Sequence, residues 1–313
     1  MPHLSIGLPV FNGEKYLSQA LDSLLNQTYT DFELIISDNA STDRTPQICR
    51  EYARKDNRIV YHRRQINLGG PANYNHTFNL ACGEYFKWAA HDDVVAKEYL
   101  ESCINVLNSD SSIVLCHSKV GCIDEAGALV GDYDGRTLTK INSIKPHERF
   151  ADMINQRNTC WAIHGVMRAS CLRKTSLHGD YIDGDRNLLA ELSLMGRMIE
   201  IPKHLFLRRD HPEAYTSTYY SKVQEVIDYR KQLAWWTGKS SKAIIVLPHW
   251  KNLLEYFRSV NRVKLKFSER LLCYREITRL LFKEKGWKLM RWDLINEFKL
   301  RQARLRYGKN SEY

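Results

Sequence analysis

The 313-residue sequence predicts an α/β fold, with a mostly parallel sheet flanked by helices and a basic helical C-terminal extension. Three observations predict it. Short apolar segments alternate with segments of helical apolar spacing over residues 4–118, which is typical of βαβ units. The hydrophobic content of 43% supplies a core for one large domain with an extension. Residues 221–313 carry 22 Lys+Arg and 9 Asp+Glu, a net of +13, which leaves a net of −3 for residues 1–220.

The elements of the first half follow one another closely. The first strand is predicted at residues 4–10 (LSIGLPV), and the first helix at 14–27, where leucines recur at helical spacing. A second strand at 34–37 (LIIS) ends at the turn residues Asp38 and Asn39. The next elements are predicted as a helix at 43–55, a strand at 58–62, a helix at 71–82, a strand at 85–90, a helix at 95–108 and a strand at 113–118.

The second half is less regular. Residues 119–160 contain several glycines and acids, and we expect hairpin or loop structure there, over the site. An amphipathic helix is predicted at 185–196, with Gly196 as its C-cap, and a strand at 205–209. The change in charge near residue 220 divides the chain into two functional parts, one expected to be catalytic and one that faces an anionic surface. We take them as residues 1–215 and as an aromatic-rich basic extension, residues 216–313.

Three polar clusters are expected at one edge of the predicted sheet. Ligands of such folds bind at the carboxyl ends of parallel strands. The segments that fall there are Pro9 to Asn12, Asp38 to Ser41, and His91 to Asp93. The sequence therefore predicts that these three clusters form one site.

The His91-Asp92-Asp93 cluster has two interpretations. Adjacent carboxylates at the end of a buried strand are costly unless something neutralises them, and a divalent cation that also holds phosphate oxygens does so. The alternative is a solvated N-cap for the helix that follows. Asp38 and Asn39 likewise suit either a base or ribose contact or a plain Asx turn. Phe11 can stack on a base or belong to the core.

The order of these motifs resembles the inverting family 2 glycosyltransferases, which have the GT-A nucleotide-sugar-binding fold. The residues that carry the resemblance lie in LPVFNGEKYLSQALDSLLNQTYTDFELIISDNASTDRTPQI, in NLGG at 67–70, in GEYFKW at 83–88 and in His91-Asp92-Asp93. It covers roughly residues 1–215. Many elements in register make it specific.

The resemblance implies roles for individual positions. Pro9, Phe11, Asn12, Asp38, Asn39, Gly69 and Asn75 would bind the nucleotide part of the donor. Asp92 would contact the ribose or sugar side, and Asp93 would ligate Mn²⁺ or Mg²⁺. His211 resembles a C-terminal histidine that some relatives use near the metal and diphosphate. Asp185, in YIDGDRNLLAEL, occupies the place of the catalytic base, although an Asp there also suits a helix N-cap.

The resemblance also implies a reaction. A UDP-, GDP- or dTDP-sugar would be the donor, and the hydroxyl of a glycan or lipid-linked glycan the acceptor, in cell-surface polysaccharide or glycoconjugate biosynthesis. Asp185 would remove the acceptor proton in a single inverting displacement. Residues 164–175 would help to shape the acceptor site. Three departures from the family pattern are Asn39, where many relatives have Asp, Tyr74, where many have Arg, and His91, where many have Asp.

Two other readings of the same residues stay open. A sugar-nucleotidyltransferase uses a related sheet, but it needs a Gly-rich, Lys/Arg-bearing loop after the first strand, and only Gly13 is present there. A non-catalytic subunit that binds nucleotide or glycan would keep the fold without turnover.

The C-terminal extension also has two readings. It contains Trp235, Trp236, Trp250, Trp287 and Trp292 among many lysines and arginines. Helices of this composition lie on anionic membranes. The alternative is a helical lobe that packs on the catalytic domain or on a second subunit of a homo-oligomer. No recognition motif for nucleic acid accompanies the basic residues.

Targeting and cysteine patterns suggest where the protein works. No apolar run approaches the roughly 18 residues of a membrane span, and no secretory signal is expected at the N-terminus. The eight cysteines form no CxxC pair, so we expect reduced thiols rather than disulfides or a zinc site. The sequence predicts a cytoplasmic protein, peripheral on the inner face of the membrane if the extension binds lipid.

Overall fold

A computed structural model describes residues 2–133, 138–155, 160–213, 229–238, 245–282 and 284–307 of the chain. Its centre is one nine-stranded sheet in the order β3-β2-β1-β4-β8-β6-β9-β5, with β7 paired to β6. The α/β class predicted from the sequence is confirmed.

The first half of the sheet is parallel. It consists of β1 (Leu4–Val10), β2 (Phe32–Asp38), β3 (Ile59–Arg63) and β4 (Tyr85–Trp88). β1 is central and pairs in parallel with β2 and β4. Because the chain returns through a helix after each strand, these strands end at the same edge.

The second half of the sheet is mixed. Its strands are β5 (Val94–Val95), β6 (Ile113–Ile123), β7 (Leu129–Asp132), β8 (Val166–Arg168) and β9 (Arg197–Arg209). β8 is antiparallel to both β4 and β6, whereas β6 and β9 are parallel. The long β9 brings residues near 209 beside residues 94 and 95, through the antiparallel β5–β9 pair.

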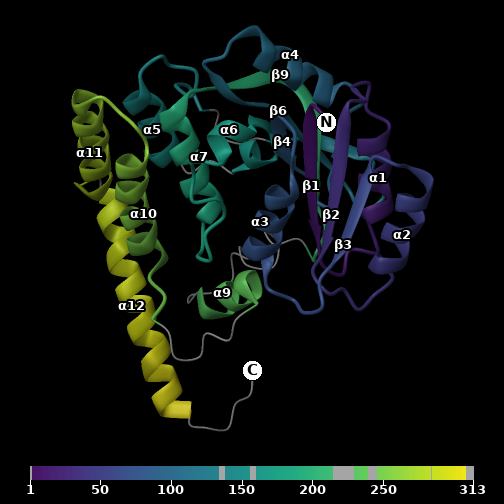
Figure 1. Cartoon of the computed structure of the whole chain (residues 1–313). Coiled ribbons are helices and arrows are strands. Elements are labelled where there is room, and N and C mark those ends of the chain that lie inside the picture. Colours follow the sequence, from purple (N-terminus) through teal and green to yellow (C-terminus); the bar gives the residue numbers. More distant parts are fainter. Residues whose placement is uncertain are drawn as a thin grey trace.

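Helices cover both faces of the sheet. α1 (Leu17–Leu25), α2 (Thr45–Lys55) and α4 (Tyr99–Ser109) share one apolar core with alternate residues of β1 and β2. α3 (Gly70–Leu80) lies against the opposite face of β1 and β2 (Figure 1). Gly7 permits this close packing, since a Cβ there would lie 2.4 Å from Thr77 Oγ1.

A second apolar core lies beyond α3. Its helices in the catalytic part are α5 (Pro146–Asn155), the 3-10 helix η1 (Trp161–His164), α6 (Ala169–Leu172) and α7 (Gly184–Met195). Buried residues of α10 (Pro248–Arg262) and α11 (Phe267–Phe282) belong to the same core. α10 and α11, from the extension, therefore form a lobe packed on α7 and α5.

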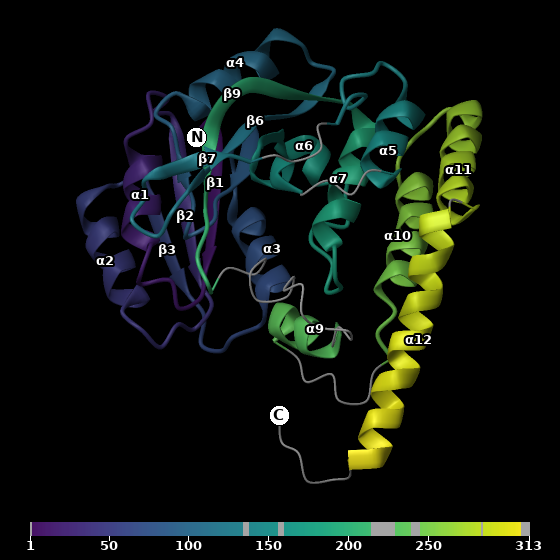
Figure 2. The same ribbon diagram turned by 180° about the vertical axis from the view of Figure 1, so that it is seen from behind.

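Two further helices complete the described chain. α9 (Tyr229–Thr237) packs on α3, and α12 (Glu284–Tyr307) runs beside α10 and α11 (Figure 2). No helix among the described residues is long and apolar enough to cross a membrane. The boundary predicted between residues 215 and 216 lies outside the described residues, so the two-part division stays a prediction.

One sequence-based expectation about secondary structure is confirmed in part, and another was wrong. Hairpin or loop structure was expected over residues 119–160, and β6 and β7 do form an antiparallel hairpin, but a helix, α5, begins at Pro146. The helix expected from Val95 begins only at Tyr99, because Val94 and Val95 pair with β9. In this second case pairing with a strand distant in sequence overrode the local pattern.

Candidate active site

The three polar clusters meet at the carboxyl edge of β1, β2 and β4, as predicted. The backbone N–H of Asn39, after β2, donates to the carbonyl of Val10 at the end of β1 (2.9 Å). A Cβ on Gly13 would lie 2.6 Å from Cδ2 of His91, so the segments after β1 and β4 also touch. The absence of a side chain at position 13 is what permits this contact.

Phe11 is held outward at this edge. Its side chain is 44% exposed, whereas Pro9 is buried within β1. Asn12 follows in the left-handed region (φ 50°) and is tied on both sides. Its N–H donates to Ser41 Oγ (2.9 Å), and its Oδ1 accepts from the N–H of Thr42 (2.9 Å). The turn therefore presents the Phe11 ring to solvent, where a planar base can stack on it.

Asp38 is fully buried and its two oxygens accept hydrogen bonds. Oδ1 accepts from the N–H of Ser41 and Oδ2 from the hydroxyl of Tyr61, each at 2.8 Å. The Nε of Arg63 lies 3.4 Å from Oδ2. The hydrogen bond from the N–H of Ser41 to Asp38 forms an Asx turn, which is one of the two interpretations predicted for Asp38. The Asp38 carboxylate lies at the edge of the sheet.

Asn39 organises the loop before α3. Its Nδ2 donates to Asn67 Oδ1 (2.7 Å) and to the carbonyl of Gly69 (3.2 Å), and its Oδ1 accepts from the N–H of Leu68 (3.0 Å). Gly69 has φ +84°, a conformation that favours glycine. Gly69 thus lies at the same edge as Asp38, as its predicted role requires.

Asp92 pairs with His211. The Nε2 of His211 lies 3.1 Å from Oδ2 of Asp92, and its Nδ1 is buried without a hydrogen-bond partner among the described residues. The imidazole packs on the ring of Tyr16, with centroids 4.8 Å apart. Burial opposes ionisation of Asp92, but His91 and His211 together hold its pKa well below the ordinary value.

Asp93 is turned differently from Asp92. Its Oδ1 accepts the backbone N–H of Arg209 at 2.9 Å, where β9 passes beside β5. Burial first, and then the charge of Asp92, raise the pKa of Asp93 well above its ordinary value. Oδ1 of Asp93 is therefore engaged by a backbone N–H, whereas Oδ2 of Asp92 faces the imidazole of His211.

Arg209 is a site residue that the sequence analysis did not single out. Its guanidinium is almost completely buried and donates to the carbonyls of Asp92 (2.8 Å), Asp124 (2.8 Å) and Glu125 (3.1 Å). It also donates to Gln19 Oε1 at 2.6 Å. Arg209 thus ties the segment that carries Asp92 to the turn after β6. The sequence feature that could have indicated Arg209 is its place as the second arginine at the end of the apolar segment LFLRR.

Asp185 lies in the first turn of α7. The residue before the helix, Asp183, has the left-handed φ of 61°, and Oδ1 of Asp185 accepts from the N–H of Arg186 (2.8 Å). Burial, followed by the charge of Asp183, raises the pKa of Asp185. The N-cap position of α7 is occupied by Asp183, which makes no side-chain cap bond, so the alternative reading of Asp185 as the N-cap was wrong.

Tyr74 lies within electrostatic reach of both acidic groups. Burial raises the pKa of its phenol, and the charges of Asp92, Asp93 and Asp185 raise it further. Its ring contacts His178 (centroids 4.8 Å apart) and Trp236 (5.9 Å). An arginine at this position would place a positive charge near the phosphates of a donor. Tyr74 places an uncharged aromatic ring there instead.

Asn75 is engaged in holding the segment before α7. Its Nδ2 donates to the carbonyl of His178 (2.9 Å), and its Oδ1 accepts the N–H of the same residue (3.0 Å). His164, in the segment expected to shape the acceptor site, accepts at its carbonyl from the buried Lys87 and from Tyr99. Burial lowers the pKa of Lys87 to about 8.

The residues present suit a divalent cation that is completed by the substrate. Among the described residues no group of three or more His, Cys, Asp and Glu side chains is arranged as a metal site. Asp92 and His211 would supply two ligands, and Mg²⁺ or Mn²⁺ commonly takes one or two protein ligands together with phosphate oxygens and water. Nε2 of His211 can serve as a ligand in the tautomer that carries the proton on Nδ1, which has no hydrogen-bond partner among the described residues.

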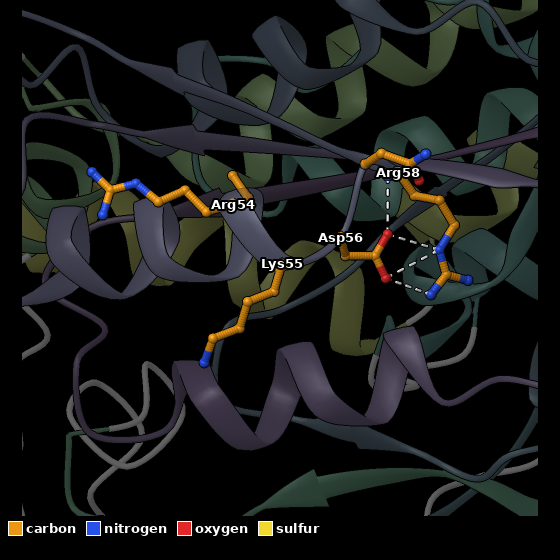
Figure 3. Close-up of a pocket in the computed structure, with 6 residues that line it drawn as sticks. Arg54, Lys55, Asp56 and Arg58 are labelled. Atoms are coloured by element: carbon orange, nitrogen blue, oxygen red, sulfur yellow. Dashed lines mark hydrogen bonds and ion pairs between the residues drawn. The ribbon is translucent and has the colours of Figure 1, made fainter.

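A surface depression elsewhere is not this site. It is lined by residues 53–58, between α2 and β3 (Figure 3). These residues precede β3 and so lie at the opposite edge of the parallel strands from Asp38. Asp56 is already paired with Arg58 Nη2 at 2.7 Å.

Comparison with known proteins agrees with this geometry. Residues 5–178 match the description "Glycosyl transferase family 2", which is more than half of the chain. An uncharacterised glycosyltransferase of Methanocaldococcus jannaschii is 33% identical over 134 residues, 42% of this chain and 46% of the relative. The GalNAc(5)-diNAcBac-PP-undecaprenol β-1,3-glucosyltransferase of Campylobacter jejuni is 32% identical over 146 residues, 46% of each. The matched segment thus spans less than half of these curated relatives.

Solved structures share the fold over most of the chain. S. aureus TarS 1-349 in complex with UDP has a TM-score of 0.60 at 17% identity and covers 90% of this chain and 72% of its own. The mannosyltransferase PcManGT of Pyrobaculum calidifontis, in complex with GDP-Man and Mn²⁺, has a TM-score of 0.52 at 15% identity, covering 95% and 86%. The predicted GT-A-type architecture with a helical extension is confirmed, and the chain belongs to glycosyl transferase family 2.

Proposed function

We propose that this protein is an inverting glycosyltransferase that transfers a sugar from a nucleoside-diphosphate sugar to the hydroxyl of a glycan or lipid-linked glycan. The observation that carries the proposal is the meeting of Asp92 and His211 at the carboxyl edge of the sheet. This meeting supports a two-ligand cation site next to the clusters after β1 and β2, which would hold the nucleotide.

The donor would lie across this edge. Phe11 offers its exposed ring to the base, and the buried Asp38 and Asn39 hold the turns beside it through their hydrogen bonds. TarS and PcManGT, which share the fold, were solved with UDP and with GDP-Man and Mn²⁺, respectively. Their complexes support a nucleotide-sugar donor as a class, without deciding between uridine, guanosine and thymidine.

Asp92 and His211 would hold the divalent cation, Mn²⁺ or Mg²⁺. When bound, the cation neutralises negative charge on the diphosphate leaving group. The ligand role of Asp93 stays a prediction. We favour Asp92 as the ligand because its Oδ2 lies beside Nε2 of His211, the second predicted ligand, whereas Asp93 is turned to the backbone of Arg209.

Asp185 would act as the general base. Its carboxylate accepts the proton of the acceptor hydroxyl as that oxygen bonds to the anomeric carbon, and the bond from that carbon to the diphosphate breaks. Attack from the face opposite the leaving group inverts the configuration. The raised pKa of Asp185 makes it a stronger base than an exposed aspartate, which suits this role.

The acceptor is proposed from the relatives. The name of the Campylobacter jejuni protein describes a glucosyl transfer to an undecaprenol-linked glycan. A lipid-linked or soluble glycan is therefore the first class of acceptor to test. Residues 164–178, which Asn75 and Lys87 hold near the site, would line its path.

Turnover is the test of this function. The purified chain is incubated with a panel of UDP-, GDP- and dTDP-sugars, Mn²⁺ and glycan acceptors, and the released nucleoside diphosphate is measured. We expect one donor to give acceptor-dependent release that EDTA abolishes. Metal-dependent nucleotide binding without release from any donor would instead favour a non-catalytic binding subunit.

A further inference from the structure

The last described helix, α12, faces the rest of the protein with polar side chains. Asp293 is fully buried, and Asn296 and Glu297 are buried beside Met290. A helix that packs on a protein core usually buries an apolar stripe and exposes its polar side. α12 departs from that rule, and its attachment to α10 explains why.

Asp293 joins α12 to the start of α10. Its Oδ2 accepts the backbone N–H of His249 at 2.9 Å, and its Oδ1 lies 2.7 Å from Nδ1 of the same residue. α10 begins at Pro248, so Asp293 meets one of the unsatisfied N–H groups of its first turn and its positive end. Trp250 Nε1 also donates to the carbonyl of Met290 at 3.2 Å. These bonds fix the rotation of α12 about its axis.

The fixed rotation directs large apolar side chains outward. The exposed fractions on this side are 52% for Trp287, 50% for Leu294, 46% for Ile295 and 61% for Phe298. Positions 287, 291, 294 and 298 follow helical spacing, so these side chains form one stripe, with exposed Arg291 inside it and exposed Lys299 at its border. We call these six residues the α12 strip.

The position of α12 leaves the strip accessible. Figures 1 and 2 show the helix at the margin of the molecule, beside α10 and reaching beyond it. Phe282, at the end of α11 and shortly before α12, is also largely exposed. Exposed apolar side chains gathered along one face of a helix mark an interaction surface.

We propose that the α12 strip lies on an anionic lipid surface. Aromatic and aliphatic side chains interleaved with Lys and Arg are typical of a helix that rests in the interface plane. The net charge of +13 over residues 221–313 favours an anionic partner over a neutral protein surface. Because no described helix is able to span a bilayer, contact through this strip would be peripheral.

The test is co-sedimentation of the full chain with vesicles. Vesicles of phosphatidylcholine alone are compared with equal mixtures of phosphatidylcholine and phosphatidylglycerol, at low and at high salt. We expect binding to the mixed vesicles only, weakened by salt. The double variant Arg291→Gln/Lys299→Gln should lose on the order of 30-fold in affinity at low salt, because each cation near an anionic surface contributes about fivefold.

Matched variants test whether vesicle binding depends on the α12 strip or on exposed cations and apolar side chains anywhere on the protein. Arg54→Gln/Lys55→Gln removes two exposed cations from the end of α2 (Figure 3) and should bind vesicles as the wild type does. Leu294→Ser/Phe298→Ser should weaken binding at both salt concentrations, whereas Val60→Ser/Ile144→Ser, at exposed apolar sites elsewhere, should not. Circular dichroism confirms that each variant is folded.

Three outcomes would overturn the proposal. The first is a wild type that sediments with neither vesicle. The second is unchanged binding of both strip variants. The third is a lipid-free dimer in sedimentation velocity that Leu294→Ser/Phe298→Ser dissociates while vesicles are not bound, which would make the strip a contact between two copies of the chain. Release of nucleoside diphosphate from a soluble donor, measured on the same samples, reports the proposed enzyme function separately.

Discussion

The Nε2 of His211 lies 3.1 Å from Oδ2 of Asp92, although 119 positions separate the two residues in the chain. β9 makes this meeting possible, because its last residues run antiparallel to β5, immediately after Asp92 and Asp93. The two neighbouring acids are thereby given different surroundings. Asp92 faces an imidazole and Asp93 faces a backbone N–H.

This difference predicts unequal effects on metal binding. Asp92→Asn should weaken Mn²⁺ binding in the presence of nucleoside diphosphate by more than about 100-fold, since loss of an outer partner alone costs 10- to 100-fold. Asp93→Asn should retain most of the affinity, because its amide oxygen still accepts the N–H of Arg209. Titration of Mn²⁺ followed by electron paramagnetic resonance measures both. If Asp93→Asn weakens Mn²⁺ binding more than Asp92→Asn does, Asp93 is the metal ligand.

Arg209 predicts an effect on stability rather than on chemistry. Arg209→Met would remove the donor from the carbonyls of Asp92 and Glu125, whereas the carbonyl of Asp124 still accepts the N–H of Gly127 (3.1 Å). A polar group left without a partner costs about 1–3 kcal/mol when it is buried, and the Asp92 carbonyl is partly buried, so we expect the free energy of unfolding to fall by about 2 kcal/mol. Urea denaturation measures it.

The adjacent arginine provides the control for that experiment. Arg208 pairs with the exposed Asp210 at 3.0 Å. The Arg208 guanidinium also lies 5.5 Å from the centroid of the Trp161 ring, whereas the backbone carbonyls described above at this edge accept from Arg209. An ion pair with one exposed partner contributes about 1 kcal/mol or less, so Arg208→Met should cost less than Arg209→Met. Equal losses for the two variants would show that the buried network around Arg209 is not what stabilises this edge.

The local pattern was sufficient for the first half of the sheet. The period of apolar residues predicted β1, α1, β2 and α2 to within a few residues, and parallel connection then placed Asp38 and His91 at one edge. Nothing in the local pattern of residues 113–132 indicated that β6 continues through Lys119 to pair with β9. That pairing depends on contacts between segments about 80 residues apart, which periodicity does not report.

The directions in which side chains point could not be predicted from the sequence either. Asp92 and Asp93 are adjacent and chemically identical, so only the course of β9 distinguishes their partners. The sequence also did not indicate which side of α12 is buried. Asp293 is a charged residue, and it is buried because it accepts a hydrogen bond from the start of α10. Composition indicated a basic aromatic surface in the extension, but not which face of which helix carries it.

The base assignment predicts a selective loss of catalysis. Asp185→Asn should leave donor binding intact and lower kcat by about 100- to 10,000-fold, the range that a general base contributes. Asp183→Asn makes the same change two residues earlier and should retain most of the rate. Single-turnover transfer and nucleotide binding are measured on both. Substantial transfer by Asp185→Asn would place the base elsewhere.

The pH dependence of the reaction follows from the surroundings of Asp185. Burial and the charge of Asp183 raise the pKa of Asp185, and the charge of Arg186 opposes them. The base acts when deprotonated, so kcat should rise with pH through a pKa above that of an ordinary aspartate. Asp183→Asn removes the second cause without removing the first. It should therefore lower the pKa of Asp185 and move the acidic limb of the profile to lower pH.

The substitution at position 183 is chosen for its backbone as well as its charge. Asp183 has φ 61°, a left-handed conformation that asparagine adopts with little strain, so the start of α7 should be preserved. An Asp22→Asn control removes an acid that bonds Tyr52, on the far side of the sheet, and should leave the limb where it is. If Asp183→Asn also leaves the limb unchanged, another group titrates there, because only a base that senses the charge of Asp183 moves when that charge is removed.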